Sequence, residues 1–336
     1  MPVQPPRTAD LVVPTIGRAS LDVLLAALAG DVAAPVASLT LVDDRPEPDS
    51  EDLEKRVAAA GFGRPTTVLT TGGRGPAAAR NAGWRSGSAP WVVFLDDDVV
   101  PQPGWGDGLA ADLASVDAPA AVGAGVGVVP GRVHVPLPPD RAPTDWERQV
   151  GGLATAPGWL TADLAVRREA LEEVGGLDER FPAAYREDTD LELRLRDAGW
   201  AGARGLRLVH HPVGPAGRWA SLRRQRGNAD DVLLARLHGR DWRDRTGEPR
   251  GGFRGHLVMV AAGATAVTAL AARRRRLAAA AAGLWAGRTA TFAWRRIAPG
   301  PRSRDEVTTM VLTSVAIPPA AVAHRARGWW RWRTAR

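Results

Sequence analysis

The segment WVVFLDDDVV at residues 91–100 constrains the fold more than any other part of the sequence. Its unbroken apolar run predicts a strand that is covered on both faces, as in a parallel sheet flanked by helices. Asp96, Asp97 and Asp98 follow that run directly, and ligands in such sheets bind at the carboxyl ends of the strands. Adjacent carboxylates repel one another unless they share a cation. The segment therefore predicts a divalent-metal site that holds a phosphate, whereas an isolated triplet would indicate a solvated acidic turn.

The sequence around this strand alternates short β-rich runs with Ala- and Leu-rich stretches over residues 10–130, which is typical of βαβ units. Strands are expected at residues 11–14, 39–42, 67–69, 91–95 and 121–128. Helices are expected at residues 20–29, 50–60, 76–86 and 107–115. The predicted fold class is therefore α/β, with a mostly parallel, Rossmann-like sheet flanked by helices.

A Pro-rich loop at residues 130–143 separates this block from a second one, and a loop of that length in a compact domain is often functional. In the second block, strands are expected at residues 161–166 and 205–210, and helices at 168–174, 187–198 and 218–238. Gly251 and Gly252 then mark a boundary. We expect a globular domain at residues 1–250 and a helical extension at residues 251–336.

Polar residues also end the first two predicted strands, at the same edge of the sheet as the aspartate triplet. Pro14 and Thr15 follow the first strand, and Asp43 and Asp44 follow the second. Asp43 is placed to accept hydrogen bonds from a base or a ribose, although aspartates at such positions commonly cap the next turn.

A Gly-rich segment at residues 72–83 leads into a predicted helix, and Pro76 suits its first turn. Arg74 and Arg80 are candidates to contact the phosphates of a nucleotide. Gly-rich loops before helices are frequent, so this segment alone is weak evidence.

A pair of acids, Glu187 and Asp188, begins a helix that Leu191 and Leu195 anchor on one face. The helix dipole favours ionised carboxylates at that end, and an ionised, fixed carboxylate is what a general base for a hydroxyl requires. Plain capping of the helix is the alternative, which we prefer for Asp190 but not for Asp188.

Taken together, these elements resemble a family 2 glycosyltransferase with a GT-A fold. The similarity covers roughly residues 8–240, in the order and at the spacing of the family. The matching segments are Val13-Pro14-Thr15, Val42-Asp43-Asp44, Arg80-Asn81-Ala82-Gly83, Phe94-Leu95-Asp96-Asp97-Asp98, Ala165-Val166-Arg167-Arg168, Val174-Gly175-Gly176-Leu177-Asp178 and Glu187-Asp188-Thr189-Asp190-Leu191.

The resemblance implies a nucleotide-sugar donor, a divalent metal, Mn²⁺ or Mg²⁺, and inversion at the anomeric carbon. Asp98 would be the direct metal ligand together with Asp96, and Asp188 would take the proton of the acceptor hydroxyl with Glu187 beside it. The donor-binding residues would be Pro14, Thr15, Asp43, Asp44, Arg74, Arg80, Asn81, Asp96 and Asp97. The chain has no cysteine, which excludes a thiolate metal site.

Three further residues are site candidates. His211 follows the last predicted strand, and a His at about this position in related enzymes can lie near the metal or the phosphates, although a lone His is more often structural. Trp159 and Asp163 belong to the stretch that should face the sugar and the acceptor. The family often has Asn or another small polar residue where Asp163 stands, so an acid there prevents assignment of the donor by analogy.

The charge is unevenly distributed along the chain. Residues 251–336 carry 15 arginines against Asp305 and Glu306, a net charge of +13, which leaves −6 for residues 1–250 out of the total of +7. An acidic globular part with a strongly basic tail predicts an anionic surface as partner.

The apolar stretches of the tail favour a membrane as that surface, because they have no role in nucleic-acid binding. None reaches the roughly 20 continuous apolar residues that span a bilayer. A single crossing by residues 256–272 would place the four arginines at 273–276 outside, against the positive-inside rule. The tryptophans suited to an interface are Trp285, Trp294, Trp329, Trp330 and Trp332.

Because nucleotide sugars are cytosolic, we expect a monotopic tail at the cytoplasmic face of a bacterial cell membrane. A lipid-linked acceptor or a growing surface glycan would explain such a tail. A hairpin that dips into the bilayer and a helical subdomain packed on the enzyme are the alternatives.

Two other functions compete with sugar transfer. A sugar-phosphate nucleotidyltransferase has a similar sheet but needs a Gly-rich phosphate loop after the first strand, where this chain has only Gly17. A non-catalytic membrane scaffold would have no need to retain Asp96, Asp98 and Asp188.

Overall fold

The computed structural model describes residues 8–31, 34–116 and 125–335. These residues form two compact units, and the first is the larger. The first unit consists of Met1–Pro136 and Leu153–Pro212, and the second of Leu137–Gly152 and Val213–Arg336. The predicted boundary at residue 250 therefore differs from the observed division, because residues 213–250 pack with the C-terminal helices.

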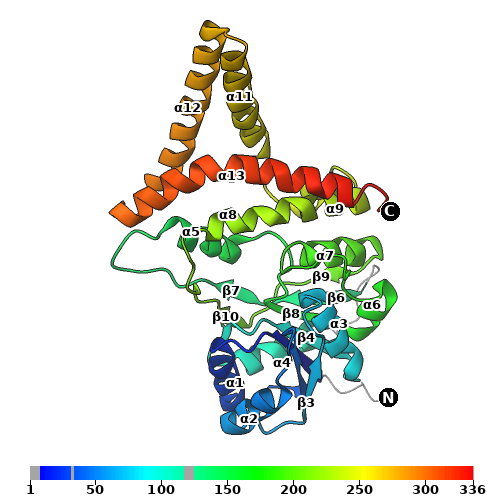
Figure 1. Cartoon of the computed structure of the whole chain (residues 1–336). Coiled ribbons are helices and arrows are strands. Elements are labelled where there is room, and N and C mark those ends of the chain that lie inside the picture. The colour runs from blue at the N-terminus through cyan, green and yellow to red at the C-terminus, as the bar shows by residue number, and fades with distance from the viewer. Residues whose placement is uncertain (1–7, 32–33, 117–124, 336) are drawn as a thin grey trace. The chain divides into compact units, whose positions relative to one another are not determined.

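A seven-stranded sheet forms the centre of the first unit (Figure 1). In spatial order its strands are β3 (Thr66–Thr70), β2 (Val36–Asp43), β1 (Ala9–Thr15), β4 (Trp91–Leu95), β8 (Asp163–Arg167), β6 (Val126–Pro130) and β9 (Ala201–Gly202). The first four are parallel, whereas β8 is antiparallel to both β4 and β6. Because β1, β2 and β4 run in the same direction, the residues that follow them meet at one edge of the sheet.

Helices and a small second sheet complete this unit. The helices are α1 (Ser20–Gly30), α2 (Ser50–Ala60), α3 (Pro76–Ser86), α4 (Trp105–Val116), α6 (Arg168–Val174) and α7 (Glu187–Asp197), with a short 3-10 helix η1 (Gly152–Thr155). The small sheet consists of β5 (Val100–Pro101), β10 (Leu208–His210) and β7 (Arg132–His134), with β10 in the middle.

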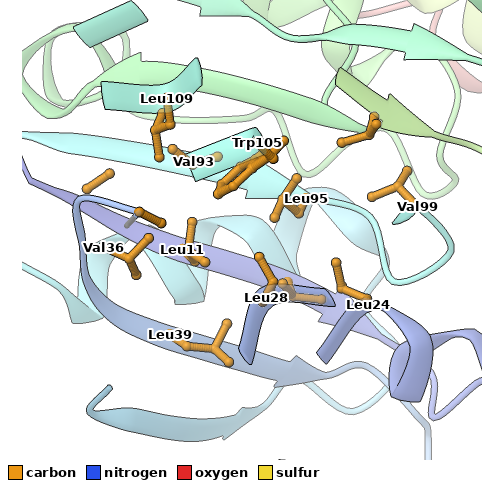
Figure 2. Packing of buried hydrophobic residues seen from close by; sticks show 14 of the residues in the cluster. Leu11, Leu24, Leu28, Val36, Leu39, Val93, Leu95, Val99, Trp105 and Leu109 are labelled. Carbon is orange, nitrogen blue, oxygen red and sulfur yellow. The ribbon is translucent and has the colours of Figure 1, made fainter. Parts of the chain in front are cut away.

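The core explains why these sequences form strands that are apolar throughout. Side chains alternate across a strand, so Leu11 and Val93 pack into one cluster while Val12 and Phe94 pack into another on the opposite face. Figure 2 shows the first cluster, in which Leu24 of α1 lies against these strands. Both faces of the sheet are buried, as the unbroken run at residues 91–95 predicts.

The structure differs from the expected elements at several places. The expected strand at 121–128 lies partly outside the described residues, and β6 begins at Val126. The expected helix at 218–238 is interrupted: α8 (Ala220–Arg223) is followed by the 3-10 helix η2 (Arg224–Gly227) and then by α9 (Asn228–His238). Gly227 is a poor helix former, and the Asn228 side chain donates to the Gln225 carbonyl, which competes with the regular helical pattern.

A buried ion network supports the edge of the sheet where β8 begins. Arg207 Nε donates to Asp163 Oδ1 and Arg207 Nη1 to Asp112 Oδ2, each at 2.7 Å. Trp105 Nε1 donates to the other Asp163 oxygen at 2.9 Å. Both oxygens of Asp163 are therefore used inside the fold, which stabilises β8 against α4 and against the segment that leads into β10.

The second unit is helical. Besides α8, η2 and α9 it contains α5 (Asp145–Gly151), α10 (Trp242–Thr246), α11 (Phe253–Ala271), α12 (Arg275–Ile297) and α13 (Arg304–Arg331). Figure 1 shows α11 and α12 as a helical hairpin and α13 running along α8 and α9. A buried ion pair joins three of these helices, because Arg296 of α12 donates to Asp145 of α5 at 2.8 Å and to Thr313 of α13 at 2.8 Å.

Two helices of this unit, α11 and α13, are long and apolar enough to cross a membrane by length and composition alone. Their most apolar windows have mean hydropathies of 1.3 and 1.4 and are 17% and 39% buried. One or two such helices are weak evidence for a span, because core helices of soluble proteins have the same properties. α13 continues through Pro318 and Pro319.

Candidate active site

A cavity of about 370 Å³ lies at the edge of the sheet where β1, β2 and β4 end. Ten of the predicted site residues line it: Pro14, Thr15, Asp44, Arg80, Asp96, Asp97, Asp98, Glu187, Asp188 and His211. Five do not: Asp43, Arg74, Asn81, Trp159 and Asp163. The fold therefore brings the aspartate triplet of β4 together with the acidic end of α7, which is about 90 residues further along the chain.

The three consecutive aspartates have different surroundings. Asp97 is buried and accepts from the Thr15 hydroxyl at 2.7 Å, which connects the ends of β4 and β1. Arg18 donates to Asp97 at 3.0 Å and to Asp98 at 2.9 Å. Asp96 accepts from Arg80 Nη2 at 2.6 Å. Asp97 therefore has a structural role, while Asp96 and Asp98 present carboxylate oxygens to the cavity.

Asp98 and His211 form the part of the cavity that suits a metal. His211 Nε2 lies 3.5 Å from Asp98 Oδ1, and its other ring nitrogen, Nδ1, is buried without a hydrogen-bond partner among the described residues. Burial, and next the charge of Asp96, raise the pKa of Asp98. A shared cation would relieve the repulsion between these two carboxylates.

The described residues contain no group of three or more His, Asp or Glu side chains that could hold a metal ion by themselves. Mg²⁺ is usually bound by one or two carboxylates together with substrate phosphates, not by a cage made only of protein groups. Carboxylate oxygens suit Mn²⁺ as well as Mg²⁺, and imidazole is a common metal ligand. Asp96, Asp98 and His211 therefore fit a metal that a bound phosphate helps to hold.

The opposite wall of the cavity is the N-terminus of α7. Glu187 and Asp188 are adjacent and Arg186 before them has the left-handed backbone conformation, with φ of 77°. Arg80 Nη1 donates to Glu187 Oε1 at 3.1 Å, so one guanidinium bridges Glu187 and Asp96. Burial acts to lower the pKa of Arg80, but the charges of Asp96 and Glu187 outweigh it, and the guanidinium stays protonated.

Burial changes the protonation of the acidic pair. It raises the pKa of Glu187 to about 8, assisted by the charge of Asp188 and opposed by Arg80. Burial also raises the pKa of Asp188, although the Thr189 amide donates to this carboxylate at 2.7 Å. The sequence suggested that the helix dipole keeps both groups ionised, but at this site desolvation is the larger effect.

The second strand end uses its two aspartates differently from the expectation. Asp43 is fully buried and accepts from the Arg45 side chain at 2.7 Å and from the Asp49 amide at 2.8 Å. Burial acts to raise the pKa of Asp43, but these hydrogen bonds outweigh it and lower the pKa. Asp44 lines the cavity and accepts from the Gly75 amide at 2.9 Å, so it also positions the Gly-rich loop.

Two candidates of the Gly-rich segment lie outside the cavity. Arg74 is exposed and pairs with Glu179. Asn81 donates to the Leu177 carbonyl at 2.8 Å and accepts from the Leu177 amide at 2.9 Å. Asn81 therefore joins α3 to the loop after α6, which is a structural role.

Asp163 and Trp159 also lie away from the acidic cavity. Asp163 is fully buried and engaged by Arg207 and Trp105, so it does not face a ligand as we expected. Trp159 lines a second, neighbouring cavity. Sequence reasoning also missed Arg18, whose only signal was its place three residues after the end of β1.

The sequence model of the family "Glycosyl transferase family 2" matches residues 10–175. The chain carries a family 2 glycosyltransferase domain. The match covers β1 to α6, including the aspartate triplet, and ends before Glu187, Asp188 and His211.

Curated relatives of this family 2 domain come from Mycobacterium tuberculosis. The chain is 33% identical over 144 residues to a pre-mycofactocin glycosyltransferase, a stretch of 42% of this chain and 29% of the relative. It is 39% identical over 90 residues to an N-acetylglucosaminyl-diphospho-decaprenol L-rhamnosyltransferase, a stretch of 26% of this chain and 29% of the relative. The chain thus matches less than a third of the length of these relatives.

The family 2 domain also has a similar solved structure. The mannosyltransferase PcManGT from Pyrobaculum calidifontis, in complex with GDP-Man and Mn²⁺, aligns with a TM-score of 0.56 at 18% identity. The alignment covers 97% of this chain and 88% of that one. At this identity the likeness concerns the fold alone, and it confirms the predicted GT-A fold, with its mostly parallel sheet and its C-terminal helices.

The raised pKa of Glu187 predicts a pH dependence of stability. In the unfolded chain this carboxyl ionises near its ordinary pKa of 4.5, but in the folded protein burial raises the pKa to about 8. Its contribution to stability is therefore present below the unfolded pKa and is lost as pH rises through about 8. The substitution Glu187→Gln should remove this loss. Relative to the wild type, the variant's free energy of unfolding should therefore rise by up to about 1.4 kcal/mol per pH unit between pH 5 and 8.

Chemical denaturation of both proteins in EDTA measures this difference. Glu51→Gln, the same change at an exposed side chain of α2, serves as the control. If the difference in free energy of unfolding between Glu187→Gln and the wild type did not change with pH, the raised pKa of Glu187 would be contradicted.

Proposed function

We propose that the protein is an inverting, metal-dependent glycosyltransferase that moves a sugar from a nucleotide-sugar donor to a hydroxyl of a lipid-linked or cell-surface glycan. The observation that carries this proposal is the acidic cavity, which has Asp96, Asp98 and His211 on one side and Asp188 on the other. The family 2 domain supplies the class of reaction, and the mannosyltransferase with a similar fold binds GDP-Man and Mn²⁺.

The donor side of the cavity requires a cation. A diphosphate in this cavity would lie beside the carboxylates of Asp44, Asp96 and Asp98, and the like charges would repel. Asp98 and Asp96, with His211, would hold the metal, which when bound supplies positive charge to the diphosphate leaving group. Arg18 and Arg80 add two fixed guanidinium groups, and Arg80 is held rigidly by its two carboxylates.

The acceptor side of the cavity requires a base, and Asp188 is placed for that role. The acceptor oxygen forms the new bond to the anomeric carbon while the bond from that carbon to the diphosphate oxygen breaks. The hydroxyl proton passes to Asp188, and the nucleoside diphosphate leaves with the electron pair. A pKa raised by burial brings this carboxylate nearer to neutral pH, where a general base is most effective.

Glu187 and Arg80 position that base. Glu187 keeps its proton at neutral pH, so the pair at the start of α7 carries a single negative charge there. Arg80 links Glu187 to Asp96 and so fixes the distance between the base and the metal side of the cavity. Such fixed geometry is a large part of what an enzyme contributes to a two-substrate reaction.

The second unit supports work at the cytoplasmic face of a membrane. It combines large exposed apolar side chains, such as Val267, Leu270 and Trp330 at 65–70% exposure, with the four arginines at 273–276. Basic and aromatic residues of this kind bind anionic headgroups and the interface. One curated relative is named for a decaprenol-linked acceptor, and a lipid-linked acceptor would make such anchoring useful.

Nucleotide binding is expected to depend on metal. In a thermal-shift panel of UDP, GDP, dTDP and CMP, one nucleotide should raise the melting temperature only when Mn²⁺ is present, because the carboxylates repel it otherwise. The stabilisation should be about 2.7 kcal/mol at a hundredfold excess over the dissociation constant. Asp98→Asn should lose this shift, and Asp107→Asn, at an exposed position of α4, should keep it. A metal-independent shift, or none with any nucleotide, contradicts the proposed donor site.

Removal of the base should abolish transfer without affecting donor binding. Asp188→Asn is expected to lower turnover by roughly 10²- to 10⁴-fold, the usual contribution of general base catalysis. Its thermal shift with nucleotide and Mn²⁺ should remain. Asp197→Asn, the same change at the other end of α7, should keep activity. A wild type without turnover on any donor would favour the scaffold function instead.

Membrane binding should depend on anionic lipid. The full chain is expected to float with phosphatidylglycerol vesicles and much less with phosphatidylcholine vesicles. Changing Arg273, Arg274, Arg275 and Arg276 to Gln should weaken the binding by tenfold or more, since each basic residue near such a surface contributes about 1 kcal/mol. Lys55→Gln, which removes a charge from the first unit, is the control. Equal binding to both vesicles would favour a helical subdomain without a membrane role.

A further inference from the structure

A second cavity of about 800 Å³ lies next to the acidic one in the first unit. The two cavities share Leu153 and Leu160 in their walls. The second is formed by β7, by the chain from η1 to Leu160, and by the segment between β9 and β10. A ligand in it would therefore lie beside the acidic cavity and within the same compact unit.

The two cavities have opposite charge. Six Asp and Glu side chains line the first cavity: Asp44, Asp96, Asp97, Asp98, Glu187 and Asp188. No acidic residue lines the second cavity, but three basic residues do: Arg132, His134 and Arg204. This is unexpected in a chain whose residues 1–250 carry a net charge of −6.

The two arginines of the second cavity also differ from the others in their unit. Among the residues that the structure describes, neither the Arg132 nor the Arg204 side chain has an ion pair, a side-chain hydrogen bond or an aromatic partner. Every other described arginine of the first unit contacts a carboxylate, a carbonyl or an aromatic ring. Examples are Arg80, Arg168 and Arg207. Two exposed, unpaired guanidinium groups in one cavity can both turn toward a ligand.

Helix α7 connects this cavity to the proposed base. Glu192 lies one turn after Asp188 and accepts from the Trp159 amide at 3.0 Å. Arg196, one turn further, pairs with Glu192 at 2.6 Å and stacks 5.1 Å from the Trp159 ring. The wall of the second cavity is thus fixed to the same helix that presents Asp188.

We propose that the second cavity binds a phosphate or diphosphate group of the acceptor between Arg132 and Arg204. Guanidinium groups bind phosphate with two parallel hydrogen bonds, and the volume suits a ligand of sugar-phosphate size. Binding there places the acceptor beside the acidic cavity, with its hydroxyl toward Asp188. This inference rests on the proposed function, since it names the acceptor class of the same reaction. The shared chemistry, a phosphate ester, is found both in lipid-linked acceptors and in soluble sugar phosphates.

Calorimetric titration of the full chain in detergent with inorganic pyrophosphate tests the site. EDTA is present throughout, so that the acidic cavity repels the probe. The wild type should bind, and Arg132→Gln with Arg204→Gln should weaken binding by about tenfold or more, as expected for the loss of charged hydrogen bonds. The double Arg→Lys variant should recover part of the affinity because it restores the charge, and Lys55→Gln should bind as the wild type does. No binding by the wild type, or equal binding by the double Gln variant, overturns the proposal.

Competition identifies the source of the phosphate. A prenyl phosphate in detergent micelles and glucose 1-phosphate are each titrated against bound pyrophosphate. If the prenyl phosphate displaces pyrophosphate at the lower concentration, the acceptor is lipid-linked. If glucose 1-phosphate does so, the acceptor is a soluble sugar phosphate. Displacement by neither overturns the site as an acceptor site.

The nucleotide thermal shift with Mn²⁺, measured on the same double Gln variant, separates this inference from the proposed function. Normal nucleotide binding by the wild type and the variant, together with failed pyrophosphate binding by the wild type, refutes the acceptor site alone. Loss of the nucleotide shift in the wild type refutes the proposed function whatever the pyrophosphate result.

Discussion

The guanidinium of Arg80 lies between two carboxylates that come from distant parts of the chain, and the arrangement of the acidic cavity depends on it. Asp96 follows a central strand and Glu187 begins a helix, and Arg80 donates to Asp96 at 2.6 Å and to Glu187 at 3.1 Å, so one side chain joins these two elements. Arg80 and Glu187 are both buried, whereas Asp96 is partly exposed to the cavity. The same guanidinium therefore closes the fold at this edge and sets the spacing between Asp96 and the N-terminus of α7.

Local sequence signals were sufficient for the elements that carry most of the site. The apolar run before Asp96 predicted a strand covered on both faces, and the structure buries every residue of β4. Helices α2, α3 and α6 have the predicted bounds, because Pro76 and the glycines at 61, 87 and 175 mark their ends. The rule that ligands bind at the carboxyl edge of the sheet then identified the strand-end residues that line the cavity, which are Pro14, Thr15, Asp44, Asp96, Asp97 and Asp98.

Sequence reasoning misplaced two kinds of residue. Some have partners that are distant in the sequence, and others have side chains that point to the opposite side from those of their neighbours. Asp43 and Asp44 are neighbours, yet one side chain turns into the fold toward Arg45 and the other toward the cavity. Asp163 pairs with Arg207, 44 residues away, and no local pattern indicates that contact. Asn81 likewise joins α3 to Leu177, 96 residues later. A motif gives the position of a polar residue on an element, but its partner is decided by the tertiary fold.

The two proposed sites would recognise phosphate in two physically different ways within one unit. Where carboxylates line the wall, a diphosphate is tolerated only with a divalent cation, and the affinity then depends on the metal. Where unpaired arginines line the wall, a phosphate is attracted directly and no metal is needed. An enzyme that binds two phosphorylated substrates side by side must keep each in its own site. Opposite wall charges do this, because a bare phosphate ester is repelled from the acidic cavity and attracted to the basic one.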